Sequence, residues 1–229
     1  MDLRRTRIVH DRPGPFLTVH VEVGGSPEGA GRRVEERWRT LRHDLEKARV
    51  DRLLIDDIGD RFVEDLRLPG AARRTVVATE DGVVLDEVQV GESEWPETTE
   101  LFAPLPDLAG WLWSQARVGT GPDDDLVADL RARVRRRRPD AVHGVHEVLE
   151  ALVRDRVERV VMDLRAAREH SVRPAEHDGL VLPAAAAVRD VLPADRVVVA
   201  MAAATDTDLC VLPLEPGSGG VAAMLRPEG

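Results

Sequence analysis

The stretch AVHGVHEVLEALVRDRVERVVMDL, residues 141–164, combines the two patterns from which the fold can be predicted. In its first part the apolar residues recur every three or four positions, which predicts a helix over 142–154. The core-facing positions of this helix would be Val142, Val145, Leu149 and Leu152. The second part, VERVVMDL, is a short apolar run that predicts a buried strand. A helix leading directly into a strand is typical of an α/β fold.

The sequence on both sides of this stretch continues the alternation of helix and strand. Downstream, ADRVVVAMAAAT (194–205) predicts a helix, and DLCVLPL (208–214) and GVAAMLR (220–226) predict two strands. Upstream, an amphipathic helix is predicted over 123–138, and Pro139 ends it. We therefore expect residues 123–229 to form one domain, an α/β sandwich.

The first half of the chain has a different order of elements. FLTVHVEV (16–23) alternates apolar and polar residues, which predicts a half-buried strand with Thr18 and His20 on the outer face. Helices are predicted over 31–50, 51–66 and within 104–115, and a β-hairpin over 74–90 that turns at Asp81-Gly82. We expect residues 1–118 to form an α+β domain. The Gly- and Pro-containing stretch 117–125 is the predicted linker.

The composition excludes several classes of protein. The 229 residues carry a net charge of −10, and neither half has an excess of Lys and Arg, which argues against nucleic-acid binding by bulk charge. Cys210 is the only cysteine, so an intramolecular disulfide is excluded. The N-terminal residues lack the apolar core of a signal peptide, and no run approaches the ~20 apolar residues of a membrane span. We expect a cytoplasmic protein.

The arginine block Arg135, Arg136, Arg137 and Arg138 allows two interpretations. It lies at the C-terminal end of a predicted helix that begins with three aspartates, and both placements are favourable to the helix dipole. The block is thus explained as a solvated helix end. Alternatively it is a patch for RNA or an acidic partner, with Arg4, Arg5 and Arg7 as the next candidates.

The remaining reactive side chains do not form a recognisable catalytic or metal-binding set. HGVHE (143–147) matches neither HExxH nor HxxEH, so we expect no metal site, and His146 is predicted to pair with Glu150 on the helix surface. We expect His170 and His177 to lie in a solvated loop, Cys210 to be a small core residue, and Asp206 and Asp208 to serve a turn. We therefore expect neither enzymatic activity nor a cofactor.

Several segments resemble one protein family. GPFLTVHVEVGGSPEGAGRRVEERWRTLRHDLEKARVD (14–51) is similar to the opening of Balon-like, actinobacterial relatives of the archaeal and eukaryotic peptide-chain release factors and Pelota. Glu36-Arg37-Trp38 and Leu41-Arg42 carry this match, and 76–91 and 101–112 fit the same N-terminal domain. Residues 141–164 and 194–226 resemble the last domain of the group, whose α/β/α fold is similar to that of the L7Ae-type RNA-binding proteins.

The resemblance also has limits that affect the expected function. The RNase H-like middle domain of the family has no room between Trp113 and Asp123, and the chain contains no Gly-Gly-Gln, so we do not expect peptide release. The resemblance implies that the N-terminal domain approaches the ribosomal decoding region, and that the last domain meets a translational GTPase or the ribosomal stalk. We therefore expect a non-catalytic, ribosome-associated protein similar to a hibernation or stress factor. The alternative is a protein-interaction or homo-oligomerisation module that no longer binds ribosomes.

Overall fold

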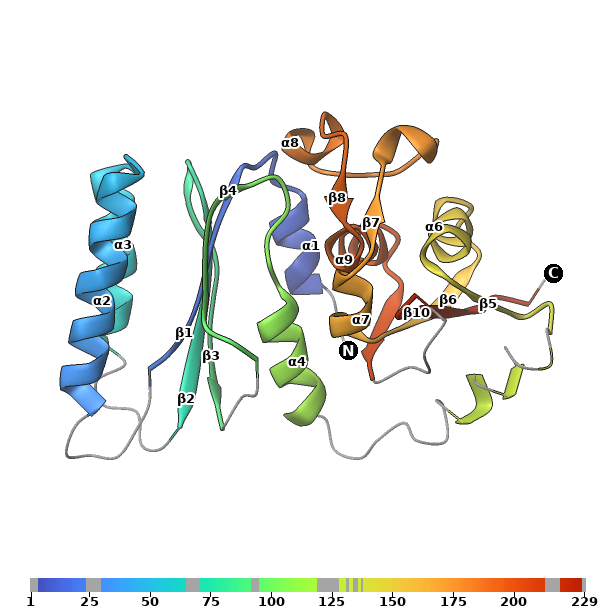
Figure 1. Cartoon of the computed structure of the whole chain (residues 1–229), viewed down its shortest axis with the longest axis horizontal. Helices are drawn as coiled ribbons and strands as arrows, with labels where there is room; N and C mark the ends of the chain where they lie inside the picture. Colours follow the sequence, from blue (N-terminus) through green and yellow to red (C-terminus); the bar gives the residue numbers. More distant parts are fainter. Residues whose placement is uncertain are drawn as a thin grey trace. The chain divides into compact units, whose positions relative to one another are not determined.

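A computed structural model describes residues 4–23, 30–64, 71–91, 95–118, 128–130, 132–133, 136, 138–212 and 219–227. The chain divides into two compact units. The N-terminal unit is Gly14–Ser114, and the C-terminal unit combines Met1–Pro13 with Gln115–Gly229 (Figure 1). Both contain helices and strands, which confirms the predicted mixed α/β class.

The N-terminal unit is built on an antiparallel four-stranded sheet in the order β3-β2-β1-β4. Its strands are β1 (Phe16–Glu22), β2 (Ala72–Thr79), β3 (Gly82–Val90) and β4 (Thr98–Ala103). The helices α2 (Ala30–Lys47) and α3 (Arg52–Glu64) lie side by side against one face of the sheet, and α4 (Ala109–Val118) lies at the other (Figure 1). The three helices predicted from periodicity in this half are therefore present.

The main core of this unit lies between the sheet and the helix pair. The apolar face predicted for α2 is buried against β1, and the ring of Trp38 stacks on Phe62 of α3 at 5.5 Å between ring centroids. The prediction that β1 is half-buried was wrong, because Thr18 and His20 on its second face are also buried. The segment that leads into α4 covers that face, and the backbone N–H of Asp107 donates to the Thr18 hydroxyl over 3.2 Å.

Two turns of the N-terminal unit follow the local sequence closely. The hairpin between β2 and β3 turns at Glu80 and Asp81, one residue earlier than predicted, and Gly82 begins β3 with a φ of 127°. Such a φ favours glycine, which explains the residue at this position. Helix α2 ends before Arg49, whose φ of 60° places it in the left-handed region that closes many helices.

The C-terminal unit contains a four-stranded sheet in the order β5-β10-β6-β9. The strands are β5 (Ala141–His143), β6 (Val157–Met162), β9 (Asp208–Val211) and β10 (Val221–Leu225), and only β6 and β9 pair in parallel. Helices α6 (Val145–Val153) and α9 (Ala194–Ala204) pack together, and α6 also contacts β6 and β10. Leu130 packs with Val161 and Ala222 in a second cluster, so apolar residues cover the sheet on more than one side.

A smaller substructure connects β6 to α9. It consists of α7 (Leu164–Arg168), β7 (Ser171–Val172), the 3-10 helix η2 (Pro174–Glu176), α8 (Ala184–Ala187) and β8 (Leu192–Pro193). Strands β7 and β8 form a two-stranded antiparallel sheet. The sequence predicted the strand β6 and the helix α9, but no element of this connection beyond a solvated loop around His170 and His177.

Two predicted boundaries differ from the structure. The helix predicted over 142–154 begins at Val145, because Ala141–His143 pair with β10 and Gly144 has a φ of 96°. Residues 1–13 were predicted to belong with 14–118, but α1 (Arg4–His10) packs on α9 of the C-terminal unit. The backbone N–H of Ala185 donates to the carbonyl of Pro13 over 2.9 Å, which ties the end of this segment to the same unit.

Other predictions fall largely on residues outside the described ranges. Of the helix predicted over 123–138, residues 128–130 and 132–133 are helical, and most of the predicted linker 117–125 lies outside the described residues. None of the helices in the described part of the chain combines the length and the apolar composition that crossing a bilayer requires.

Candidate binding surface of the C-terminal unit

The structure describes two of the four arginines in the predicted patch, and a carboxylate pairs with one of them. Arg136 and Arg138 are exposed, while Arg135 and Arg137 lie outside the described residues. The Nε atom of Arg138 lies 3.4 Å from Oδ1 of Asp140. Neighbouring Arg133 pairs with both Asp129 and Asp140 at 2.8 Å. Carboxylates are therefore interspersed with the guanidinium groups along this segment.

The second group of predicted arginines lies on a different element. Arg5 and Arg7 are exposed on α1, and the side chain of Arg4 lies outside the described part of the structure. Because α1 packs on α9 whereas 136–138 precede β5, the structure places the two groups on separate elements.

The histidines of the C-terminal unit are arranged differently from the prediction. The expected pair of His146 with Glu150 does not form in the structure, in which Glu150 accepts from Arg154 over 2.6 Å. His177 was expected in a solvated loop, but it is only 8% exposed. The turn of η2 brings its ring to 4.8 Å from the ring of His146, measured between centroids. His177 is therefore buried in part by a tertiary contact with His146 of α6.

The remaining candidate reactive groups have structural surroundings. Cys210 is half-buried in β9, Asp206 has a φ of 53° in the turn after α9, and Asp208 begins β9 with Arg159 at 3.5 Å. The turn predicted for Asp206 is confirmed. Within the described ranges, no group of three His, Cys, Asp or Glu side chains is arranged to hold a metal ion.

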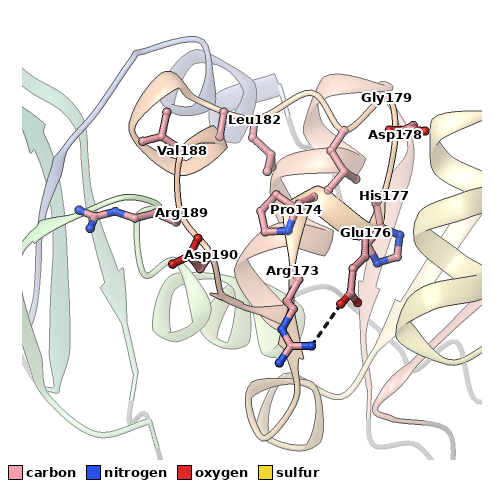
Figure 2. A pocket seen from close by; sticks show the side chains of 13 residues that line it. Arg173, Pro174, Glu176, His177, Asp178, Gly179, Leu182, Val188, Arg189 and Asp190 are labelled. Carbon is pink, nitrogen blue, oxygen red and sulfur yellow. Dashed lines mark hydrogen bonds and ion pairs between the residues drawn. The ribbon is translucent and has the colours of Figure 1, made fainter.

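A hollow of about 510 Å³ lies in the connection between β7 and β8. Figure 2 shows its two sides: η2 with Arg173, Pro174 and Glu176 on one, and the segment around α8 with Val188 on the other. Arg173 donates to Glu176 over 3.1 Å, as the dashed line marks. The lining is mixed, with apolar side chains beside both charge signs; it also includes Asp178, Leu180, Leu182, Ala187, Arg189 and Asp190.

Three exposed valines lie in this connection, and together we call them the valine surface; Val188 lines this hollow, and Val181 and Val191 each line an adjoining one. Val181, Val188 and Val191 are 62%, 81% and 50% exposed. Their backbone is nevertheless anchored: the N–H of Val181 donates to the Met201 sulfur over 3.2 Å, and Ala186 at the centre of α8 is fully buried. An anchored segment that presents apolar side chains to solvent is typical of a surface that binds another molecule.

The sequence analysis assigned no element to GLVLPAAAAVRDVL (179–192) and missed this surface. A signal was present, because an apolar run that fits neither a helix of three turns nor an alternating strand has no obvious core to enter. No known protein family and no curated protein matches the sequence of this chain.

Proposed function

We propose that the chain is a non-catalytic binding protein of the translation apparatus, associated with the ribosome in the manner of a hibernation or stress factor. The observation that supports it most is the valine surface beside the hollow of the C-terminal unit. Because the backbone is anchored, these side chains leave water only when a partner covers them, and removing their apolar surface from water favours that binding. This unit is also the one that resembles the family's last domain.

The charges favour a protein partner for this surface. Arg133 and Arg138 are paired with carboxylates, and the chain carries a net charge of −10, which disfavours strong binding to phosphates. A translational GTPase or the protein stalk of the ribosome therefore fits better than rRNA. Arg136, with Arg5 and Arg7 of α1, provides a weaker RNA contact in this proposal.

Co-sedimentation of the tagged chain with ribosomes tests the proposal. We expect wild-type protein to pellet with ribosomes and Val188→Asp to pellet at least about tenfold less, because a charge in an apolar contact costs more than 1.4 kcal/mol. Val90→Asp is the matched control, because Val90 is also a strongly exposed valine, at 70%, and belongs to the other unit. Equal pelleting of the two variants, or no pelleting of the wild type, contradicts the proposal.

Two further measurements separate the proposed contacts. Binding that is unchanged between low and high salt indicates the valine surface, whereas binding that weakens steeply with salt indicates phosphate contacts. A size-exclusion profile in which the wild type is a dimer and Val188→Asp a monomer, with no ribosome binding by either, supports the alternative of an oligomerisation module.

A further inference from the structure

We propose that the C-terminal unit binds a phosphate group, or a similar oxoanion, in a second hollow next to that of Figure 2. This hollow has a volume of about 480 Å³ and lies between α6 and the segment from β7 to η2. We call it the histidine hollow; the polar side chains that line it are His146, His170, Ser171, Arg173, Glu176 and His177. The inference does not depend on the proposed function, because either can fail while the other holds.

The three histidines reach the hollow from different elements. His146 lies in the first turn of α6, His170 directly precedes β7, and His177 follows η2. The rings of His146 and His177 lie 4.8 Å apart, and His177 is 92% buried, as its exposed fraction of 8% implies. Its Nδ1 atom has no hydrogen-bond partner among the described residues. A buried imidazole with unused hydrogen-bonding capacity at a cavity wall is unfavourable unless a ligand or water uses it.

The start of α6 adds hydrogen-bond donors on the same side. The nine-residue helix begins after Gly144, and no side chain caps its first backbone N–H groups. Such N–H groups, together with the positive end of the helix dipole, favour an anion. Val145 and His146 of this first turn line the hollow. The side chain of Ser171, with no hydrogen bond to a described residue, provides one more donor.

The hollow is lined by one guanidinium, that of Arg173, and one carboxylate, that of Glu176. Arg173 lines it, and a guanidinium repels a metal ion while it matches the geometry of a phosphate. The carboxylate that lines the hollow is Glu176, which is already paired with Arg173 at 3.1 Å. Glu147 lies over the backbone of Gly144, where a Cβ atom would be 2.6 Å from its Oε2, and it is outside the lining.

Titration of the full chain with sodium phosphate at pH 7 and constant ionic strength, followed by calorimetry and by the imidazole proton resonances, tests the inference. We expect saturable binding with the largest shifts at His146 and His177. His146→Gln and Arg173→Gln should each weaken binding at least about tenfold, because a hydrogen bond to a charged group contributes more than 1.4 kcal/mol. His177→Gln should also weaken binding, and His170→Gln, at an exposed position of the hollow, should do the same and replaces it if His177→Gln does not fold.

His143→Gln is the matched control, because His143 is an exposed histidine of β5 that does not line the hollow. It should bind phosphate like the wild type. A response that does not saturate, or that weakens equally in His143→Gln and His146→Gln, overturns the inference. Saturable binding of zinc without binding of phosphate also overturns it, in favour of a cation site.

A second titration uses sulfate, whose charge does not change between pH 8 and pH 5.5. Sulfate should bind saturably, and more weakly to His146→Gln than to His143→Gln. Equal binding of sulfate by the two variants contradicts a site built on imidazoles. A phosphorylated ribose, compared with ribose, then shows whether a phosphate monoester or only the free anion occupies the hollow.

Discussion

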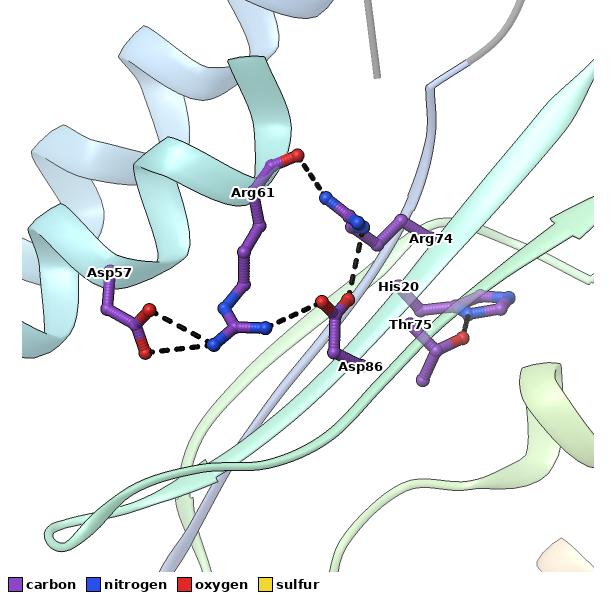
Figure 3. Close-up of polar contacts among 6 residues, drawn as sticks. All are labelled: His20, Asp57, Arg61, Arg74, Thr75 and Asp86. Atoms are coloured by element: carbon purple, nitrogen blue, oxygen red, sulfur yellow. Dashed lines mark hydrogen bonds and ion pairs between the residues drawn. The ribbon is translucent and has the colours of Figure 1, made fainter. Parts of the chain in front are cut away.

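The imidazole ring of His20 in β1 lies directly against the backbone of Gly110 in α4, so that a Cβ atom at Gly110 would collide with His20 Nε2. On its other side, Nδ1 of the ring is hydrogen-bonded to the Thr75 hydroxyl at 2.6 Å (Figure 3). This contact fixes how closely α4 can approach the second face of the sheet. It also explains why position 110 of α4 is a glycine: any side chain there would overlap the buried ring of His20.

Gly110→Ala should destabilise the N-terminal unit. In an exposed helix this change stabilises by about 1 kcal/mol, but the collision with His20 should reverse the sign and cost about 1–3 kcal/mol. Urea unfolding followed by tryptophan fluorescence measures it, because all four tryptophans lie within Gly14–Ser114. In a His20→Ala background the same change should cost far less. An equal cost in both backgrounds would show that the ring is not the obstacle.

Acid should destabilise the N-terminal unit through His20. Burial, and next the nearby Arg73 guanidinium, lower the pKa of His20 from 6.5 to about 4. A histidine with a lowered pKa in the fold contributes stability that is present above pH 6.5 and is lost as the pH falls towards 4. The loss should reach about 3 kcal/mol, as 1.36 kcal/mol per pKa unit implies. His20→Asn should flatten this pH dependence, and His43→Asn, at an exposed position of α2, should not.

The elements that the sequence predicts best are those whose pattern is local. The helix face of Val34, Leu41 and Leu45 can be read from spacing alone, and all three residues are buried as expected. The same holds for β6 and α9, where apolar runs of the expected length end at charged or turn residues. Periodicity is sufficient here because each element buries one continuous stripe.

Elements that depend on distant partners were not predictable in this way. Strand β5 has three residues and pairs with β10, whose sequence lies about 80 positions downstream. In the local sequence, only Gly144 indicated that helix α6 begins after this glycine. The burial of His177 depends on a tertiary contact with His146. Part of the arginine patch was correctly expected to be exposed, but the pairing of Arg138 with Asp140 across a turn was not expected.

Asp86 should matter more for stability than an exposed aspartate. Its Oδ2 accepts from Arg61 over 2.7 Å, and its Oδ1 lies 3.1 Å from Nε of Arg74, which is only 8% exposed and also donates to the Arg61 carbonyl (Figure 3). Asp86→Asn removes the negative charge that lies 3.1 Å from this buried guanidinium, which should cost about 1.5–3 kcal/mol in urea unfolding.

The matched control for this ion pair is Asp56→Asn. Asp56 is 48% exposed and lies 3.5 Å from Arg42 and 3.9 Å from Arg52, so solvent screens both pairs. The change should cost less than about 0.5 kcal/mol. Costs of the same size for Asp56→Asn and Asp86→Asn would show that burial does not distinguish the two carboxylates.

Asp163 should be the residue that fixes the start of α7 and, through its backbone, the end of the sheet. Its carboxylate accepts from the backbone N–H groups of Arg165 at 3.0 Å and Ala166 at 3.1 Å, and its own N–H donates to the carbonyl of Gly220 over 2.8 Å. A methyl group at Gly220 would collide with the backbone of Ala167, so α7 and β10 are closely packed.

Asp163→Ala removes the cap and should cost about 1 kcal/mol of unfolding free energy, whereas Asp163→Asn should retain most of the stabilisation by the cap, because asparagine caps helices about as well as aspartate. Hydrogen exchange of the amides in α7 and at the start of β10 measures the effect locally, since the C-terminal unit contains no tryptophan. Faster exchange in Asp163→Asn as well as in Asp163→Ala would mean that the negative charge, and not the hydrogen bonds of the cap, stabilises this junction.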